Sequence, residues 1–248
     1  MEKIALVTGS SRGIGRAVAT ELARQGWAVC INYREREDCA RSLVEQLTGE
    51  GCRVMAVQAD VACREQVNTM VRQVEDTFGP VALLVNNAGV AGQALFQDIT
   101  DELWHRYFSV NVDGAYHAIQ AVLPAMLHHH QGCIINTSSI CGLIGHMNTP
   151  EAYTATKGAI TLLTKSVAAR YGKDNIRCNS IHPATVDTPF VAALMADPVK
   201  KQARLNEIPL GRLTSVEDVA NAVLYLASDE ASFLNGVNLP IDGGVTCY

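Results

Sequence analysis

Short, continuous runs of apolar residues recur along the chain at fairly regular intervals. Each run has the length of a strand, and polar residues do not alternate with the apolar ones. Continuous apolar runs are typical of parallel strands that helices cover on both faces. The pattern predicts strands at residues 4–7, 28–31, 54–57, 82–85, 133–136 and 176–181.

The segments between these runs have the periodicity of amphipathic helices. Apolar positions recur at helical spacing in residues 17–24, 40–47 and 67–78. Alternating strands and helices predict a doubly wound α/β fold with a largely parallel central sheet. Because no linker, repeat or low-complexity tract interrupts the alternation, we expect residues 1–248 to form a single domain.

Two later segments predict longer helices. Residues 100 to about 129 carry a wide apolar stripe. The next helix is expected to begin with Thr149 as its N-cap and Pro150 at its first position. Its body is apolar beyond what one buried face requires, which predicts a second buried face at a subunit interface.

Composition narrows the class of protein. The 248 residues are 48% hydrophobic with a formal charge of −5, which argues against a basic nucleic-acid-binding surface. No apolar run is long enough to cross a bilayer, and no secretory signal opens the chain. The eight cysteines form no CxxC pair, so we expect reduced thiols in a cytoplasmic protein and no metal site. Residues 128–130, three consecutive histidines, are interpreted as a helix end.

A glycine-rich turn follows the first predicted strand. Gly9, Gly13 and Gly15 lie between that strand and the first helix. Glycine allows a tight turn and lets the backbone approach a pyrophosphate, while the helix N-terminus offers unpaired N–H groups. The spacing G-x-x-x-G-x-G differs from the usual dinucleotide fingerprint, so packing alone could also explain these glycines.

The end of the second predicted strand distinguishes between nicotinamide cofactors. An acidic residue there would bind the adenosine ribose hydroxyls, but this chain has Asn32, Tyr33 and Arg34. Together with Arg12 in the glycine turn, Arg34 suits a 2′-phosphate, since guanidinium groups pair with phosphate oxygens. NADP(H) is therefore the predicted cofactor, unless Arg34 is only a solvated loop residue. Asp60 and Val61, after the third strand, are predicted to meet the adenine.

Further motifs occur in a fixed order: 86–89 (NNAG), Asn111, 138–139 (SS), Tyr153 and Lys157 one helical turn apart, 183–189 and 242–244 (DGG). With the glycine turn, this set resembles the short-chain dehydrogenase/reductase family in its shorter form, and is most similar to the 3-oxoacyl-acyl-carrier-protein reductase branch. The resemblance runs from residue 3 to about 244. It implies a Rossmann-type fold and, together with the doubly apolar long helices, a homotetramer.

The resemblance also implies the chemistry. Tyr153 would be the general acid in reduction and the general base in oxidation, with Lys157 lowering its pKa and holding the nicotinamide ribose. Ser139 would bond the substrate oxygen, and Asn111 would position a water that links Lys157 to solvent. The implied cofactor-binding residues are Gly9, Ser11, Arg12, Gly13, Ile14, Gly15, Asn32, Tyr33, Arg34, Asp60, Val61, Asn87, Ala88, Gly89, Tyr153, Lys157, Pro183, Val186 and Thr188.

Several alternatives stay open. Ser138 is a second candidate for the substrate-binding hydroxyl, and His146 is interpreted as a solvated loop residue rather than a site residue. The substrate is expected to be an acyl thioester or a small molecule, with a sugar, polyol or small ketone as the alternative. A non-catalytic NADP(H)-binding regulatory protein is a rival from another class. A substrate lid is predicted at about residues 188–210.

Overall fold

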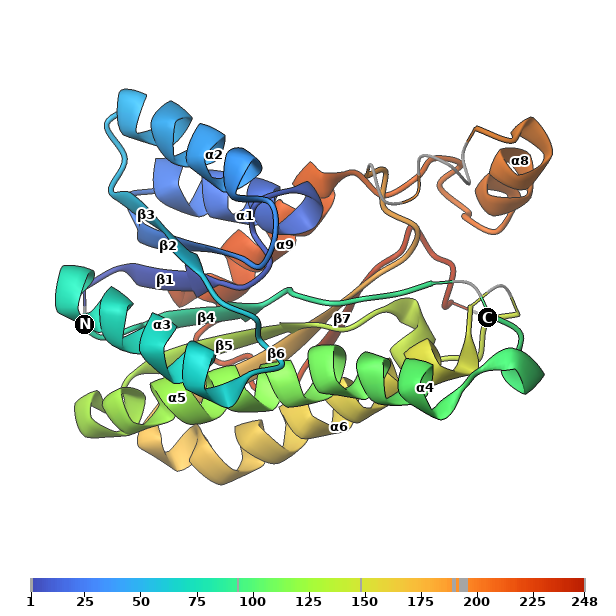
Figure 1. The fold of residues 1–248 in the computed structure, drawn as a ribbon. Helices are drawn as coiled ribbons and strands as arrows, with labels where there is room; N and C mark the ends of the chain where they lie inside the picture. Colours follow the sequence, from blue (N-terminus) through green and yellow to red (C-terminus); the bar gives the residue numbers. More distant parts are fainter. Residues whose placement is uncertain (1, 93, 148, 189–190, 192–195, 248) are drawn as a thin grey trace.

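The computed structural model describes residues 2–92, 94–147, 149–188, 191 and 196–247. Within them, seven parallel strands form one sheet in the order β3-β2-β1-β4-β5-β6-β7 (Figure 1). The predicted α/β fold with a parallel sheet is therefore confirmed. The strands are β1 (Ile4–Val7), β2 (Ala28–Tyr33), β3 (Val54–Gln58), β4 (Leu83–Asn86), β5 (Gly132–Thr137), β6 (Ile176–Pro183) and β7 (Asn238–Ile241).

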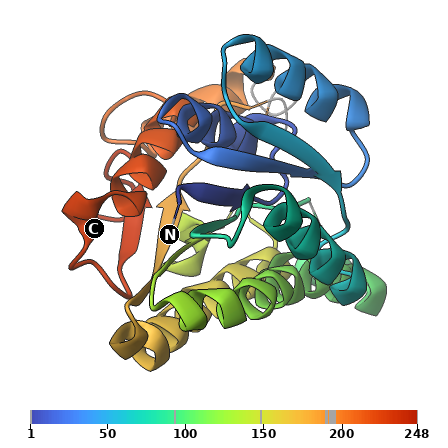
Figure 2. The same ribbon diagram turned by 90° about the vertical axis from the view of Figure 1, so that its left-hand side faces the viewer.

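Helices cover both faces of the sheet, as Figure 2 shows end-on. One face carries α1 (Gly13–Arg24), α2 (Glu37–Gly49) and α9 (Val216–Ala227). The other carries α3 (Arg64–Phe78), α5 (Gly114–His129) and α6 (Glu151–Tyr171), and α4 (Asp101–Phe108) precedes α5. Each interface holds its own cluster of buried apolar side chains. Burial on both sides explains why the strands read as continuous apolar runs.

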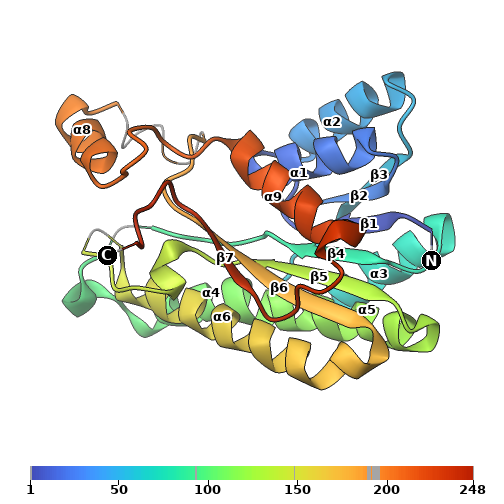
Figure 3. The same ribbon diagram turned by 180° about the vertical axis from the view of Figure 1, so that it is seen from behind.

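One helix stands apart from these layers. α8 (Pro198–Asn206) lies beyond the carboxyl ends of the strands, on the side where the glycine turn opens (Figure 3). Asp197 caps it by accepting a hydrogen bond from the Val199 N–H at 2.9 Å, and Pro198 occupies its first position. In doubly wound sheets this edge is where ligands bind.

The seventh strand was not predicted. β7 has only four residues, includes Pro240 and pairs with β6 alone. Proline lacks an N–H, which is tolerated at the edge of a sheet because no further strand needs that donor. The helix before it, α9, also escaped prediction, although Ser215 and Asp218 form a reciprocal capping box at its start.

Two helix predictions need correction. Residues 100–129 are not one α-helix, because a π-helical turn (Ser109–Asp113) separates α4 from α5. Thr149 is not the N-cap of α6. Pro150, with extended backbone angles, takes that place and Glu151 is the first helical residue. The Thr149 hydroxyl instead contacts His146 Nδ1 at 3.2 Å.

Within the described part of the chain, no helix combines the length and apolarity that a membrane span requires. Over the same residues, no group of three or more histidine, cysteine, aspartate or glutamate side chains converges on a point that could hold a metal ion. The three histidines at 128–130 lie where α5 ends, and His130 adopts the left-handed conformation that closes the helix.

Candidate active site

The glycine turn forms a cradle at the carboxyl end of β1. Gly9 and Gly13 have positive φ angles of 62° and 57°, which favour glycine. A Cβ on Gly15 would lie 2.5 Å from Asn87 Nδ2 and 2.6 Å from the Gly9 carbonyl oxygen. Since α1 begins at Gly13, its unpaired N–H groups lie beside this turn. The turn therefore fits a pyrophosphate, which needs close backbone approach and N–H donors.

Buried polar side chains hold the cradle in shape. Asn32 is 1% exposed, accepts a hydrogen bond from Gly9 N–H at 3.0 Å and donates one to the Ala59 carbonyl at 3.0 Å. Asn32 thus supports the turn from inside, and its predicted contact with the cofactor stays a prediction. The Thr8 hydroxyl accepts from the N–H groups of Asn87 and Ala88, both at 3.0 Å. Sequence reasoning missed Thr8.

The predicted adenosine end of the site has two exposed arginines. Arg12 precedes α1, and Arg34 follows β2. Arg34 pairs with Glu35, and its Nη1 lies 3.8 Å from Asp60 Oδ2. Both guanidiniums are on the cradle's edge of the sheet, as the 2′-phosphate hypothesis requires. Tyr33, by contrast, is largely buried.

Val61 follows β3 and packs into the fold. Its side chain is buried, and a Cβ on Gly114 would be 2.7 Å from Val61 Cγ2. Its carbonyl oxygen accepts a hydrogen bond from His117 Nδ1 at 3.0 Å. The side chain and the carbonyl oxygen of Val61 are therefore engaged within the fold, and its contact with the adenine stays a prediction.

Ser139, Tyr153 and Lys157 come together at the same edge of the sheet. Ser139 follows β5, and its hydroxyl hydrogen-bonds the Tyr153 side chain in the first turn of α6. Lys157 is 5% exposed. Its Nζ lies 5.5 Å from the centre of the Tyr153 ring and donates a hydrogen bond to the Thr137 carbonyl at 2.8 Å.

Burial shifts the pKa values of both ionisable groups. Burial lowers the pKa of Lys157 to about 8, because the ammonium loses hydration. Burial also raises the pKa of Tyr153, an increase that the Ser139 hydrogen bond opposes. That Lys157 lowers this pKa stays a prediction, because the shift seen here comes first from burial. The ammonium is bonded to the Thr137 carbonyl, and burial of the phenol dominates.

The two adjacent serines have different surroundings. Ser138 is 3% exposed and donates to the Lys157 carbonyl at 2.9 Å, so its hydroxyl packs against the α6 backbone. Ser139 faces Tyr153 instead and accepts from the Cys141 N–H at 3.2 Å. The structure therefore favours Ser139 over Ser138 as the hydroxyl next to a substrate.

We expect Ser139→Ala to lower kcat/KM by about 100-fold, as when one donor to a developing oxyanion is removed. Ser138→Ala should leave kcat/KM within a few-fold and lower the free energy of unfolding by about 1 kcal/mol, since one buried hydrogen bond is lost. Steady-state kinetics and denaturant titration of both variants test this. A larger kinetic loss in Ser138→Ala would reverse the assignment.

Asn111 lies in the π-helical turn and is 3% exposed. Its Oδ1 accepts from the Val90 N–H at 2.7 Å, and its Nδ2 donates to the Val90 carbonyl and the Thr156 hydroxyl, both at 3.0 Å. The side chain thereby fastens the loop after β4 to α6. π-Turns are frequent at functional sites.

The segment after β6 reaches the glycine turn. Pro183 ends β6, and Val186 is buried where it bridges to Thr214. A Cβ on Gly13 would be 3.7 Å from Thr188 Cγ2, so Thr188 lies against the cradle. This position is compatible with the predicted contact of residues 183–188 with the nicotinamide end.

His146 is not the solvated residue that the sequence suggested. Its side chain is only 12% exposed, and its Nε2 lies 3.1 Å from Arg204 Nη1 and 3.3 Å from Glu207 Oε2. These contacts join the loop after β5 to α8. α8 belongs to the predicted lid, and residues 189–190 and 192–195 of that lid lie outside the described residues.

His182 is a buried residue that sequence reasoning missed. It is fully buried, and its Nδ1 donates to the Ser139 carbonyl at 2.8 Å while its Nε2 contacts the Ser180 hydroxyl at 2.8 Å. Burial lowers the pKa of His182. A histidine inside an otherwise strand-like run was the signal that could have identified it.

Comparison with known proteins agrees with this geometry. A sequence model of the short-chain dehydrogenase/reductase family, described as enoyl-(acyl carrier protein) reductase, matches residues 9–246. The 3-oxoacyl-[acyl-carrier-protein] reductase FabG of Staphylococcus epidermidis is 38% identical over 245 residues, 99% of each chain. The L-rhamnose 1-dehydrogenase (NAD(P)(+)) of a Sphingomonas species is 39% identical over 98% of this chain and 96% of that protein.

A solved structure is also similar over the whole chain. A gluconate 5-dehydrogenase from Burkholderia cenocepacia, in complex with NADP and tartrate, superimposes with a TM-score of 0.94 at 34% identity. The alignment covers 100% of this chain and 97% of that one. Sequence, fold and arrangement of the site lead to the same conclusion: this chain belongs to the short-chain dehydrogenase/reductase family of oxidoreductases.

Proposed function

We propose that this chain interconverts a carbonyl and an alcohol, using NADP(H) and Tyr153 as the proton donor and acceptor. One observation carries the proposal: the Ser139 hydroxyl, the Tyr153 phenol and the buried Lys157 ammonium converge at the sheet edge that also holds the glycine cradle. A carbonyl placed there would meet a hydrogen-bond donor and a proton source together.

The cradle and the arginines support NADP(H). The cofactor supplies or accepts the hydride when it is bound. Gly9, Gly13 and Gly15 would admit its pyrophosphate, and Arg12 and Arg34 would pair with a 2′-phosphate. The solved gluconate 5-dehydrogenase carries NADP, which agrees with this assignment, while the rhamnose dehydrogenase is named for both NAD and NADP.

We expect Arg34→Ala to raise the KM for NADPH about tenfold or more, because a charge-assisted hydrogen bond to phosphate is lost. The KM for NADH should stay within about twofold. Steady-state kinetics with each cofactor measure this, and Arg41→Ala on the exposed face of α2 is the control. An equal effect on both cofactors would assign Arg34 a role unrelated to the 2′-phosphate.

The proton steps follow from the site. In reduction the Tyr153 phenol would give its proton to the carbonyl oxygen as the carbon accepts hydride, and in oxidation the phenolate would take it back. Ser139 would hold the oxygen by a hydrogen bond. Lys157, beside the ring, would stabilise the phenolate that reduction leaves behind.

A 3-oxoacyl thioester is the substrate that we favour. The alignment with the Staphylococcus epidermidis reductase covers 99% of this chain, and the description of the family model also names an acyl-carrier-protein reductase. The alternative is a sugar or polyol, which the similarity to the rhamnose and gluconate dehydrogenases supports. Family members share cofactor and mechanism more closely than substrate, since specificity depends on the loops.

The test is a panel of substrates assayed by NADPH absorbance. It contains a 3-oxoacyl thioester, small ketones and ketoses, and in the reverse direction L-rhamnose, gluconate and polyols with NADP⁺. Thioester turnover that Tyr153→Phe abolishes would establish the acyl reductase. Turnover of sugars alone would support the alternative. Tight NADPH binding without any turnover would leave two explanations, a substrate outside the panel or a non-catalytic NADP(H)-binding protein.

We also infer that the chain is a cytoplasmic homotetramer of single-domain subunits, each with a lid at about residues 188–210. Exposed apolar side chains on the outer helices support association, since Tyr116 on α5 is 42% exposed and Leu162 on α6 is 68% exposed. Size-exclusion chromatography with light scattering tests this, and a monomer at micromolar concentration would contradict it.

A further inference from the structure

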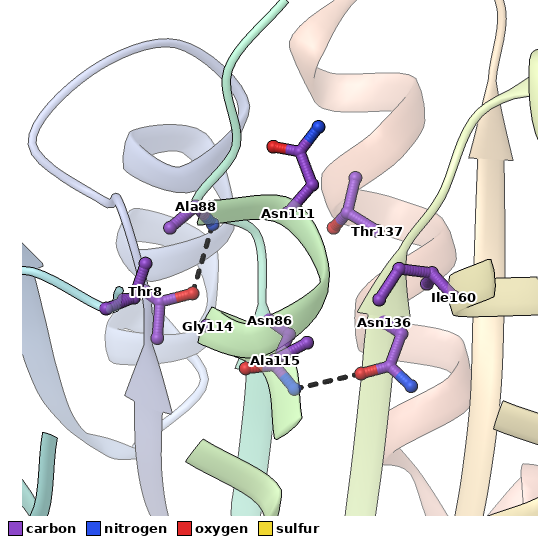
Figure 4. Close-up of a pocket in the computed structure, with 10 residues that line it drawn as sticks. Thr8, Asn86, Ala88, Asn111, Gly114, Ala115, Asn136, Thr137 and Ile160 are labelled. Atoms are coloured by element: carbon purple, nitrogen blue, oxygen red, sulfur yellow. Dashed lines mark hydrogen bonds between the residues drawn. The ribbon is translucent and has the colours of Figure 1, made fainter. Parts of the chain in front are cut away.

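A small cavity lies between β4, β5 and the start of α5 (Figure 4). It leaves about 10 Å³ to the centre of a water-sized sphere, which is near the minimum that holds one water molecule. Its lining residues include Asn86, Asn111, Asn136 and Thr137 and no charged residue. A polar cavity of this size suits a single neutral ligand.

A ladder of buried hydrogen bonds leads into this cavity. The donor and the acceptor of each bond follow from the bond that lies farthest from the cavity. The Thr164 hydroxyl donates to the Ile160 carbonyl at 2.8 Å, since a carbonyl can only accept. Thr164 Oγ1 therefore accepts from Asn136 Nδ2 at 2.9 Å.

The next step of the ladder reaches the cavity itself. With Asn136 Nδ2 committed to Thr164, Asn136 Oδ1 accepts from Asn86 Nδ2 at 2.9 Å (Figure 4). Asn86 must then turn its Oδ1 away from Asn136. Flipping the Asn86 amide would place Asn86 Oδ1 against Asn136 Oδ1, and neither oxygen can donate a hydrogen bond. The ladder therefore fixes which atom of the Asn86 amide is oxygen and which is nitrogen.

Two polar atoms are left over at the cavity. Asn86 Oδ1 and Thr137 Oγ1 are buried, and neither has a hydrogen-bond partner among the described protein groups. Asn86 is 7% exposed. An unpaired buried polar atom costs about 1–3 kcal/mol, so native proteins rarely leave two on residues that line one cavity.

We propose that this cavity is a binding site for one internal water molecule, which donates a hydrogen bond to Asn86 Oδ1 and makes a second one with Thr137 Oγ1. The ligating atoms are side-chain oxygens of Asn86 on β4 and Thr137 on β5, and Asn111 lines the same cavity from the π-helical turn. The Thr137 carbonyl also accepts a hydrogen bond from the Lys157 ammonium. The water would therefore stabilise the end of β5, to which the lysine is bonded. The inference does not depend on the proposed substrate.

The direction in which one substitution shifts the melting temperature tests the site. Thr137→Val keeps the shape of the side chain and removes only the hydroxyl. If water is bound, its hydrogen bond is lost and the melting temperature of the full-length protein should fall by about 2–4 °C. If the cavity is dry, the variant removes an unpaired buried hydroxyl, and the melting temperature should stay equal or rise. Thr48→Val, at an exposed position on α2, is the matched control.

A high-resolution crystal structure of the unmodified protein provides a direct test that needs no variant. We expect an ordered water within hydrogen-bond distance of Asn86 Oδ1 and Thr137 Oγ1, and its loss in Thr137→Val. An empty cavity in a well-ordered map would overturn the proposal, as would an unchanged or higher melting temperature of the variant.

Discussion

Replacing Tyr153 with Phe is expected to lower kcat by about 1,000-fold while the dissociation constant for NADPH changes less than about threefold. A positioned general acid contributes roughly 100- to 10,000-fold, and only the hydroxyl is removed. The ring keeps its packing in the first turn of α6, where Lys157 Nζ lies 5.5 Å from its centre. Steady-state kinetics and fluorescence titration with NADPH separate the two quantities.

Tyr171→Phe is the matched control, since Tyr171 ends the same helix far from Ser139. It should retain the wild-type kcat within about twofold. A Tyr153→Phe variant that kept more than about a tenth of the wild-type kcat would show that another group donates the proton. An equal loss of NADPH binding would instead indicate that the phenol acts in cofactor binding.

Lys157→Met is expected to abolish measurable turnover and yet stabilise the protein assayed without dinucleotide, by about 3.5 kcal/mol near neutral pH. Burial lowers the pKa of Lys157 from 10.5 to about 8, and each pKa unit corresponds to roughly 1.4 kcal/mol. The folded state thus carries a penalty for the charged ammonium. Methionine has a similar shape without the charge, and replacing buried charges by apolar groups is often stabilising.

This stability difference has a defined pH dependence. Below pH 8 the lysine is protonated in both the folded and the unfolded state, so the full penalty is present. Between pH 8 and 10.5 the unfolded state binds more protons, so the free energy of unfolding of the wild type rises relative to the variant. Above 10.5 the difference due to charge is gone.

Denaturant titrations of both proteins at a fixed protein concentration, across this pH range, measure the difference. Lys165→Met, at an exposed position on α6, should show no such pH dependence. If Lys157→Met were less stable than the wild type near neutral pH, the hydrogen bond from Lys157 to the Thr137 carbonyl would outweigh the cost of burying the charge.

Stability and function are therefore expected to oppose each other at Lys157. A buried ammonium is unfavourable for folding, but it is the group that can stabilise a phenolate beside it. Such conflicts are typical of active sites, where a residue is kept for chemistry rather than for packing. The combination of a lost activity and a gained stability would distinguish this role from an ordinary structural lysine.

Local patterns in the sequence were sufficient for the fold and for the centre of the site. Six of the seven strands were predicted because burial on both faces leaves a continuous apolar run. The glycine turn was found because close backbone approach excludes a Cβ, and the spacing of Tyr153 and Lys157 because one helical turn separates them. Each of these signals depends only on residues close together in the chain.

The remaining features depend on partners that are distant in the sequence. Asn32 supports Gly9 from inside, Ser138 bonds the α6 backbone, and His146 packs against α8. A polar side chain at a strand end can face a ligand or the core, and only the packed neighbours decide which. The sequence by itself determined the fold, the nucleotide cradle and the Tyr153–Lys157 pair. The tertiary structure decided which polar groups are exposed to a ligand, because burial forces each remaining one to find a hydrogen-bond partner elsewhere in the fold.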